Sequence, residues 1–263
     1  MTELLTLAKQ LIPAMHAAGT AIMAVCDKQV SFKSDGSPVT IADEAAEAIL
    51  LKALAHYAPD IPVISEENAA SHHQEVAPIY WLVDPLDGTK EFIKDNGSGA
   101  FTVNIGLIKQ GQPVMGLVYA PFFETLYYGV VGEGAYRVVS GGKAHPLRTS
   151  SDCPARHDII AIASASHRDE ATNDWLTRHQ IITTKPVGSS LKFCLIAAGE
   201  ADLYPRFGPT MEWDTAAGDA VLRAAGGITC FEDGTPYHYG KTGYRNGPFF
   251  AYRHHGLMTG LAG

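Results

Sequence analysis

Two aspartates, Asp84 and Asp87, lie on either side of a proline in the stretch WLVDPLDGTKEF. The apolar run before them, residues 79–83, predicts a strand that ends at Asp84. Pro85 disfavours helical geometry at Asp84, so the chain must turn, and both carboxylates and the Leu86 carbonyl can then face one point. Because Mg²⁺ prefers oxygen ligands and a phosphate can complete its shell, the motif predicts a magnesium–phosphate site. The alternative is a proline-containing turn in which Asp87 caps a helix.

The residues that follow favour a bound anion. Gly88 has no Cβ, so the backbone can lie close to a ligand at this position. Residues 89–92 predict the start of a helix, whose free N–H groups and dipole attract negative charge. Together these features indicate that a phosphate binds beside the carboxylates.

Two distant segments offer further carboxylates. The stretch VISEEN ends a predicted strand in Glu66 and Glu67, and EWDTAAG places Asp214 near the start of an Ala-rich helix. Taken singly, such an acidic pair is usually solvated, and an aspartate near a helix start is usually a cap. If these side chains converge with Asp84 and Asp87, the cluster requires cations, because like charges repel strongly when desolvated.

Composition and charge exclude several classes of protein. The 263 residues, 46% of them hydrophobic, are enough for one large domain or two lobes. A net charge of −8 is unfavourable for binding a nucleic-acid polymer, whereas a small anion can still bind where metal ions reverse the local field. The cysteines form no CxxC pair, which favours a reducing compartment; they are Cys26, Cys153, Cys194 and Cys230.

The N-terminal segment and the apolar runs bear on the cellular compartment of the protein. The start, MTELLTLAKQ, lacks a basic segment followed by a continuous apolar core, so we predict no signal peptide. No apolar run is long enough to span a bilayer. We therefore expect a cytoplasmic protein, and leave open peripheral association with the inner membrane and the oligomeric state.

The order of the predicted elements divides the chain into two parts. Apolar residues at helical spacing predict a helix over residues 3–26, and Thr40 or Asp43 begins a second helix. Mostly antiparallel strands follow, up to a linker-like stretch at residues 140–154. Strands and helices alternate after it, which is typical of an α/β layer. The predicted lobes are residues 1–145 and 146–263.

Several motifs together resemble a known family. DPLDGTKEF, the upstream SEE and the downstream WDTAAG resemble the Mg²⁺-dependent, lithium-sensitive phosphatases of the inositol monophosphatase superfamily. GSSLKF and LYPRFGPT are similar to its CysQ-type branch of 3'(2'),5'-bisphosphate nucleotidases. The resemblance runs from about Ser34 to Gly227. It implies an α+β fold, a layered α-β-α-β-α sandwich whose site lies between two lobes.

The resemblance also implies an activity. The protein would remove the 3'-phosphate of adenosine 3',5'-bisphosphate, giving AMP and phosphate, and 3'-phosphoadenylyl sulfate is a second candidate substrate. An inositol monophosphatase or related sugar phosphatase is the main alternative. A Mg²⁺- and nucleotide-binding regulator without turnover is a third hypothesis.

By the same resemblance, two or three Mg²⁺ ions would be bound. Glu66, Asp84 and the Leu86 carbonyl would hold one ion. Asp84, Asp87 and Asp214 would hold a second, and Glu66 would reach a third through water. Two ions of this kind can stabilise both the attacking and the leaving oxygen of an in-line displacement.

The resemblance assigns the chemistry of the attacking water to Thr89 and Asp43. Thr89, paired with Asp43, would position the water and help to deprotonate it. The backbone N–H groups of Gly88 and Thr89 would hold the scissile phosphate. The residues alone favour the alternative that Asp43 is a helix N-terminal charge interacting with the dipole.

On the substrate side, the candidates are Ser189, Ser190, Lys192 and Arg206. A second phosphate would need cationic partners, which an uncharged inositol ring would not. Alternatively the serines cap the next helix and the two cations are solvated. Glu212 would either touch the leaving-group sugar or be a surface acid. Residues of the metal and phosphate site would also contact the substrate: Glu66, Leu86, Asp87, Gly88, Thr89 and Asp214.

Some features depart from the family or point elsewhere. The family usually has NGEFTVNI where this chain has NGSGAFTVNI, which leaves the closing of that loop undecided. DPLDGT spaces its aspartates three positions apart, whereas the nucleophile motif DxDGT of haloacid-dehalogenase phosphatases spaces them by two. The pairs His72–His73 and His254–His255 lie in polar segments, and we expect surface residues there rather than ligands.

Overall fold

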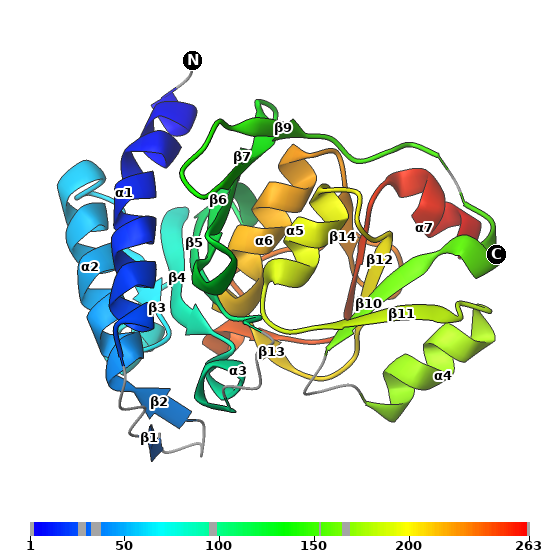
Figure 1. The fold of residues 1–263 in the computed structure, drawn as a ribbon, viewed down its shortest axis with the longest axis horizontal. Helices are drawn as coiled ribbons and strands as arrows, with labels where there is room; N and C mark the ends of the chain where they lie inside the picture. The colour runs from blue at the N-terminus through cyan, green and yellow to red at the C-terminus, as the bar shows by residue number, and fades with distance from the viewer. Residues whose placement is uncertain are drawn as a thin grey trace.

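The chain folds into five stacked layers, helices alternating with sheets (Figure 1). The structure is a computed structural model, and it describes residues 3–25, 30–32, 38–94, 99–152, 154–164 and 169–261. Cys26, Cys153 and residues 96–98 of the altered NGSGAF loop lie outside the described residues.

The first layer consists of α1 (Glu3–Met23) and α2 (Ile41–Tyr57). Thr40 caps α2, and Asp43 returns the bond to the Thr40 backbone, which forms a capping box. The two helices lie side by side and turn their apolar faces onto the neighbouring sheet. Both predicted helices are therefore present, although α1 ends at Met23 rather than at residue 26.

The second layer is the large sheet. Within the described residues its strand order is β3-β4-β5-β6-β7-β8-β9, and only β3 and β4 are parallel neighbours. The register between β4 and β5 shifts between Asp84 and Asp87, so the central motif forms a bulge. The strands are β3 (Val63–Ser65), β4 (Ile79–Asp87), β5 (Thr102–Lys109), β6 (Gln112–Ala120), β7 (Thr125–Val130), β8 (Gly134–Val139) and β9 (His145–Leu147).

The middle layer consists of α5 (Leu191–Ala197) and α6 (Trp213–Ala224). Helix α6 lies closely on the large sheet because three paired glycines, Gly106, Gly116 and Gly129, form a row across β5, β6 and β7. A Cβ added to Gly106 would come within 2.7 Å of the Ala216 methyl group. The glycines therefore let a helix backbone approach the sheet.

The fourth layer is the small sheet, and α4 (Glu170–Arg178) and α7 (His255–Leu261) cover its outer face. Its order in the described part of the chain is β11-β10-β12-β16-β14. The strands are β10 (Ile160–Ser164), β11 (Thr183–Val187), β12 (Leu203–Arg206), β14 (Ile228–Cys230) and β16 (Phe249–Tyr252).

The remaining elements are short. They are β1 (Val30–Phe32), β2 (Pro38–Thr40), α3 (Thr89–Lys94), β13 (Thr210–Met211), β15 (Arg245–Asn246) and the 3-10 turns η1 (Ala69–His73), η2 (Pro121–Phe123), η3 (Arg156–Asp158) and η4 (Thr242–Tyr244). The short helix predicted to start after Asp87 is present as α3.

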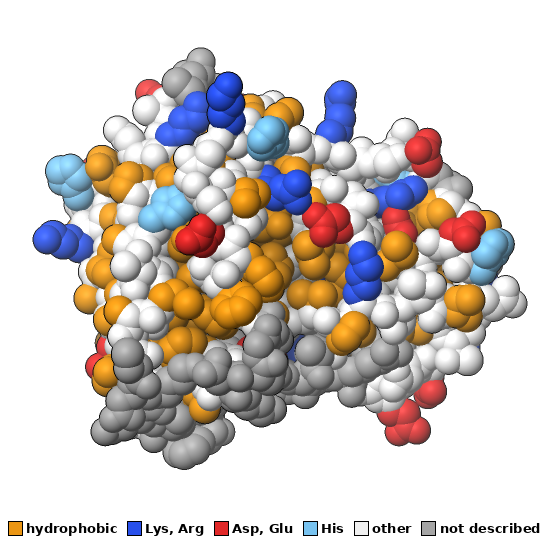
Figure 2. Space-filling model, in the orientation of Figure 1, with side chains coloured by type: hydrophobic (Ala, Val, Ile, Leu, Met, Phe, Trp, Pro, Cys, Tyr) orange, Lys and Arg blue, Asp and Glu red, His pale blue; other side chains and the backbone are white. Residues whose placement is uncertain are grey.

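The layered α+β fold is confirmed, whereas the division into lobes at residue 145 stays a prediction. The central core joins side chains of both parts, because it holds residues of the large sheet, α5, α6 and the small sheet. None of the helices formed by described residues is both long and apolar enough to cross a membrane. On the face in Figure 2, Lys and Arg side chains are scattered among Asp and Glu and form no continuous basic track.

Candidate active site

The bulge in β4 points the central motif into the interior. Asp84 is 1% exposed, and its Oδ1 accepts a hydrogen bond from the Leu86 backbone N–H at 3.0 Å. The Leu86 carbonyl accepts from the Thr89 hydroxyl at 3.1 Å. Gly88 then turns with φ +93, a geometry that favours glycine, and a Cβ there would lie 3.0 Å from the Ala100 carbonyl oxygen. The turn therefore depends on a glycine at this position.

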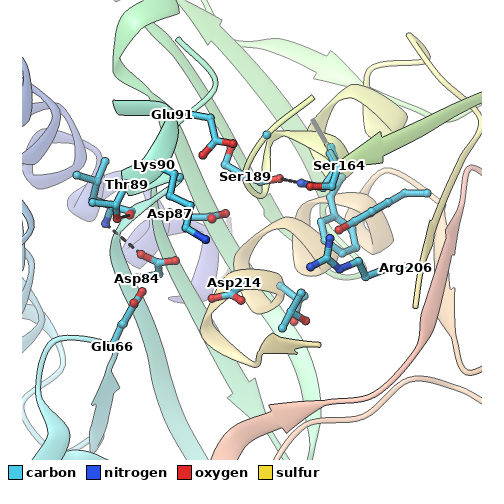
Figure 3. A pocket seen from close by; sticks show the side chains of 18 of the residues that line it. Glu66, Asp84, Asp87, Thr89, Lys90, Glu91, Ser164, Ser189, Arg206 and Asp214 are labelled. Atoms are coloured by element: carbon cyan, nitrogen blue, oxygen red, sulfur yellow. Dashed lines mark hydrogen bonds between the residues drawn. The ribbon is translucent and has the colours of Figure 1, made fainter. Parts of the chain in front are cut away.

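Three carboxylates from separate segments meet beside this turn. Glu66 follows β3, Asp84 lies on β4, and Asp214 lies in the first turn of α6. Each offers an oxygen, and these oxygens lie within 4.8 Å of one another. Figure 3 shows the three side chains converging from two sides of the pocket.

A pocket of about 280 Å³ surrounds this cluster, between the large sheet, α3 and the N-terminal ends of α5 and α6. Most of the side chains predicted for the site line it: Glu66, Asp84, Leu86, Asp87, Gly88, Thr89, Ser189, Lys192, Arg206 and Asp214. Asp43 and Ser190, which were also predicted, are not among the lining residues and contact the site from behind.

Asp43 is buried behind Thr89. Its Oδ2 accepts from the Thr40 backbone N–H and hydroxyl, both at 2.8 Å, and its Oδ1 lies 3.3 Å from the Thr89 hydroxyl. The two interpretations of Asp43 are therefore compatible, since one oxygen caps α2 and the other faces Thr89. Burial is the largest cause that raises the pKa of Asp43, and this makes its carboxylate a better proton acceptor.

Ser190 contacts Asp87 through its backbone N–H and not through its side chain. Its N–H donates to Asp87 Oδ2 at 2.5 Å, while its hydroxyl points into a buried group with Thr102 and Asn104 of β5. The expected cap of α5 by the Ser190 side chain is absent. The Ser189 hydroxyl instead accepts a hydrogen bond from the Leu191 N–H at 3.3 Å. The hydrogen bonds of the Ser190 hydroxyl to Thr102 and Asn104 anchor the start of α5 to the large sheet.

Three aspartates of the pocket, Asp84, Asp87 and Asp214, have raised pKa values. Burial raises the pKa of Asp84 and of Asp214 well above its usual range, and repulsion from neighbouring carboxylates adds to this. Burial likewise raises the pKa of Asp87 to about 7, although the charge of Lys192 opposes the shift. A bound cation would offset the effects of burial and of the repulsion between carboxylates on these pKa values.

The residues present fit a divalent metal ion. Asp84 Oδ2 is buried and has no hydrogen-bond partner within the described part of the chain. Such an orphaned oxygen is costly unless a ligand satisfies it. Because it lies beside Glu66 and Asp214, the cluster offers hard oxygen donors of the kind that Mg²⁺ binds.

Two cationic side chains lie on the opposite side of the pocket. Lys192 is 6% exposed, donates to the Ser189 carbonyl at 2.5 Å and lies 5.1 Å from the centre of the Tyr204 ring. Arg206 is 8% exposed and donates to the carbonyls of Gly208 and Pro209. Both are thus buried and oriented rather than solvated. Burial lowers the pKa of Lys192 to about 8.

Sequence reasoning missed part of the pocket and misjudged Glu212. Further lining residues are Lys90, Glu91, Ser164, Gly188, Phe193, Tyr204, Pro209, Thr210 and Thr215. Lys90 and Glu91 follow Thr89 directly and could have been included on that ground. Glu212 is neither a surface acid nor a pocket residue: it is fully buried and accepts from the backbone of Gly240 and Lys241 at 2.9 Å.

Two pairs of histidines, His72–His73 and His254–His255, were expected at the surface, and one member of each pair is only half-buried. His72 is in fact half-buried and stacks on Trp213, whereas its neighbour His73 is exposed. His254 is half-buried and contacts the Asp152 carbonyl.

With this fold and site, the chain belongs to the inositol monophosphatase family, whose pattern matches residues 3–262. Among curated proteins it is 48% identical to the 3'(2'),5'-bisphosphate nucleotidase CysQ of Salmonella typhimurium over 218 residues, 80% of this chain and 84% of that protein. It is 46% identical to the CysQ of Escherichia coli over 231 residues, 84% of this chain and 89% of that protein.

Solved structures show the same fold. The crystal structure of CysQ from Bacteroides thetaiotaomicron superposes with a TM-score of 0.77 and 37% identity, covering 93% of this chain and 96% of that one. An inositol monophosphatase from Anabaena gives a TM-score of 0.79 with 27% identity, covering 99% and 95%. These likenesses confirm the family and the layered fold predicted from the motifs.

Proposed function

We propose that this protein is a Mg²⁺-dependent phosphatase that removes the 3'-phosphate of adenosine 3',5'-bisphosphate, giving AMP and phosphate. The observation that carries the proposal is one pocket with a carboxylate cluster on one side and two buried cations, Lys192 and Arg206, on the other. The names of the CysQ relatives support a nucleotide bisphosphate as substrate. The sulfated relative, 3'-phosphoadenylyl sulfate, fits the same chemistry, and a cytoplasmic location agrees with both.

The metal ions would be held by the converging oxygens. Glu66, Asp84 and the Leu86 carbonyl form one proposed set of ligands, and Asp84, Asp87 and Asp214 form another. Bound divalent ions would supply electrostatic stabilisation of the phosphoryl oxygens and would make water easier to ionise.

The residues behind the turn would take the proton of the attacking water. The Thr89 hydroxyl takes a proton from the water and gives its own proton to Asp43 Oδ1, 3.3 Å away, so Asp43 ends the step protonated. The water oxygen then bonds to phosphorus, the bond from phosphorus to the ribose 3'-oxygen breaks, and that oxygen takes a proton from solvent. The backbone N–H groups of Gly88 and Thr89 would hold the phosphate in line.

Specificity would come from the second phosphate of the nucleotide. Lys192 and Arg206 are oriented by backbone carbonyls, so little side-chain freedom is lost when an anion binds. Ser189 lines the same side of the pocket. An inositol monophosphate carries no second phosphate for these two cations to bind.

Phosphate release tests the proposal. Adenosine 3',5'-bisphosphate, inositol 1-phosphate and fructose 1,6-bisphosphate are compared at matched concentrations, each with Mg²⁺ and with a chelator. We expect release from the nucleotide, strongly preferred and dependent on Mg²⁺. Preference for a sugar phosphate would contradict the substrate, and Mg²⁺-independent release would contradict the metal assignment. Tight nucleotide binding without release would favour a regulator.

A further inference from the structure

His72 connects two segments that are far apart in the sequence. It lies on η1, and its Nε2 is 2.7 Å from the Ser65 carbonyl oxygen. Because a carbonyl oxygen only accepts, Nε2 carries the hydrogen and donates it. The same ring stacks on the Trp213 indole, with centroids 4.7 Å apart and planes at 21°.

The two contacts end next to two members of the carboxylate cluster. Ser65 precedes Glu66, and Trp213 precedes Asp214. Glu66 and Asp214 offer oxygens within 4.8 Å of each other, although one follows an edge strand of the large sheet and the other begins α6. One side chain outside the pocket therefore contacts the neighbours of both carboxylates.

Both partners of His72 are themselves held firmly. The Ser65 hydroxyl donates to Glu47 of α2 at 2.5 Å, and its backbone N–H donates to the Ser71 hydroxyl at 3.1 Å. Trp213 is 5% exposed. Ser65 and Trp213 are thus fixed to different layers, and His72 contacts both.

We propose that His72 is a positioning residue that fixes the separation of Glu66 and Asp214 and thereby strengthens divalent-ion binding. Without a cation the two carboxylates repel each other, and the hydrogen bond and the stack of His72 oppose their separation. The inference rests on the proposed function, since it takes this cluster as the metal site. It extends that function to a residue that does not line the pocket.

The test compares His72→Ala with His73→Ala, a matched control at the exposed neighbour. Mg²⁺ and Mn²⁺ binding to the metal-free full-length chain is measured by titration calorimetry without substrate. We expect the Kd of His72→Ala to rise about tenfold, because partners outside the ligand shell typically change metal affinity by 10–100-fold. His73→Ala should bind like the wild type.

Two further variants separate the contacts and cover a failure of His72→Ala to fold. His72→Phe keeps an aromatic ring on Trp213 without the N–H donor, and His72→Gln keeps a donor without the ring. Each should lose part of the affinity, and each should keep more of it than His72→Ala. A merely structural role would lower the melting temperature of the metal-free variants and leave the Kd unchanged.

The outcomes distinguish the two proposals. Unchanged Kd in the folded His72 variants, with a wild type that binds the ion, overturns the role of His72 alone. A wild type that binds neither ion overturns the metal assignment of the proposed function, and the role of His72 with it. A Kd that rises only in the His72 variants supports both the metal site and the role of His72.

Discussion

At the scale of single residues, the Ser190 backbone N–H donates a hydrogen bond to the Asp87 carboxylate. We predict that Asp87→Asn nearly abolishes turnover, because the amide keeps an acceptor for Ser190 but loses the negative charge. Phosphate release and circular dichroism are measured on the same preparation. Normal turnover in a folded variant would contradict the role of Asp87.

Lys192 provides a second test at this scale. We predict that Lys192→Ala raises KM for adenosine 3',5'-bisphosphate by roughly tenfold or more, since a charged hydrogen bond contributes about 1.5–3 kcal/mol. KM for inositol 1-phosphate should change much less. Lys185→Ala is the control, because Lys185 is exposed and contacts only the outer Glu200 carbonyl among the hydrogen bonds described. Equal effects on both substrates would remove Lys192 from recognition of a second phosphate.

At the scale of elements, the row of glycines under α6 sets how closely that helix approaches the large sheet. A methyl group on Gly116 would overlap the Ala217 carbonyl oxygen in the second turn of α6. We predict that Gly116→Ala costs about 1–3 kcal/mol of stability, as overpacked cores do. It should also weaken metal binding, because α6 begins with Trp213 and Asp214.

Chemical denaturation and metal titration check this prediction. The control is Gly132→Ala or Gly141→Ala, positions where a Cβ meets nothing within 4 Å although the positive φ adds some strain. If Gly116→Ala unfolds like the wild type and binds metal equally well, the close approach of α6 does not position the site.

Elements with local signals could be predicted from the sequence. The capping box of Thr40 and Asp43 and the apolar spacing of α1 depend on neighbouring residues, so both helices were found. Helix α7 and strand β9 were missed, because they are short and their positions depend on distant partners. The layer order came from the family resemblance rather than from local pattern.

The same distinction holds for the candidate site. Proline and glycine at fixed positions identify the residues of DPLDGT from the sequence. The predicted start of a helix identifies Asp214. Glu212 and His72 have no such local signal, since their partners are Lys241 and Trp213. Their roles depend on contacts that only the folded chain brings together.

For the whole molecule, the carboxylate cluster links stability to pH and metal. In the folded chain Asp87 binds a proton up to about pH 7, whereas in the unfolded chain it loses the proton near its ordinary value of 3.8. Between these values the folded state binds more protons, so its stability falls as the pH rises. The raised pKa values of Asp84 and Asp214 act in the same direction.

We therefore predict that a chelator lowers the melting temperature more at pH 8 than at pH 5.5, because Mg²⁺ binds the ionised carboxylates. Asp87→Asn is the control, because it keeps the other titrating groups and lacks only the Asp87 carboxyl. In chelator, the stability of the wild type relative to this variant should fall between pH 4 and 7. A constant difference would show that Asp87 titrates normally.

Helix α6 has a consequence for how the protein is made. It fills the centre of the molecule, yet the ribosome delivers residues 213–224 only after every strand of the large sheet. Until then the inner face of that sheet, with Ile64, Leu82 and Val118, lacks its helical cover. A nascent chain stopped before α6 should therefore need chaperones to stay soluble. Because Asp214 arrives on the same helix, the acidic cluster is completed in the same step of synthesis that covers the sheet.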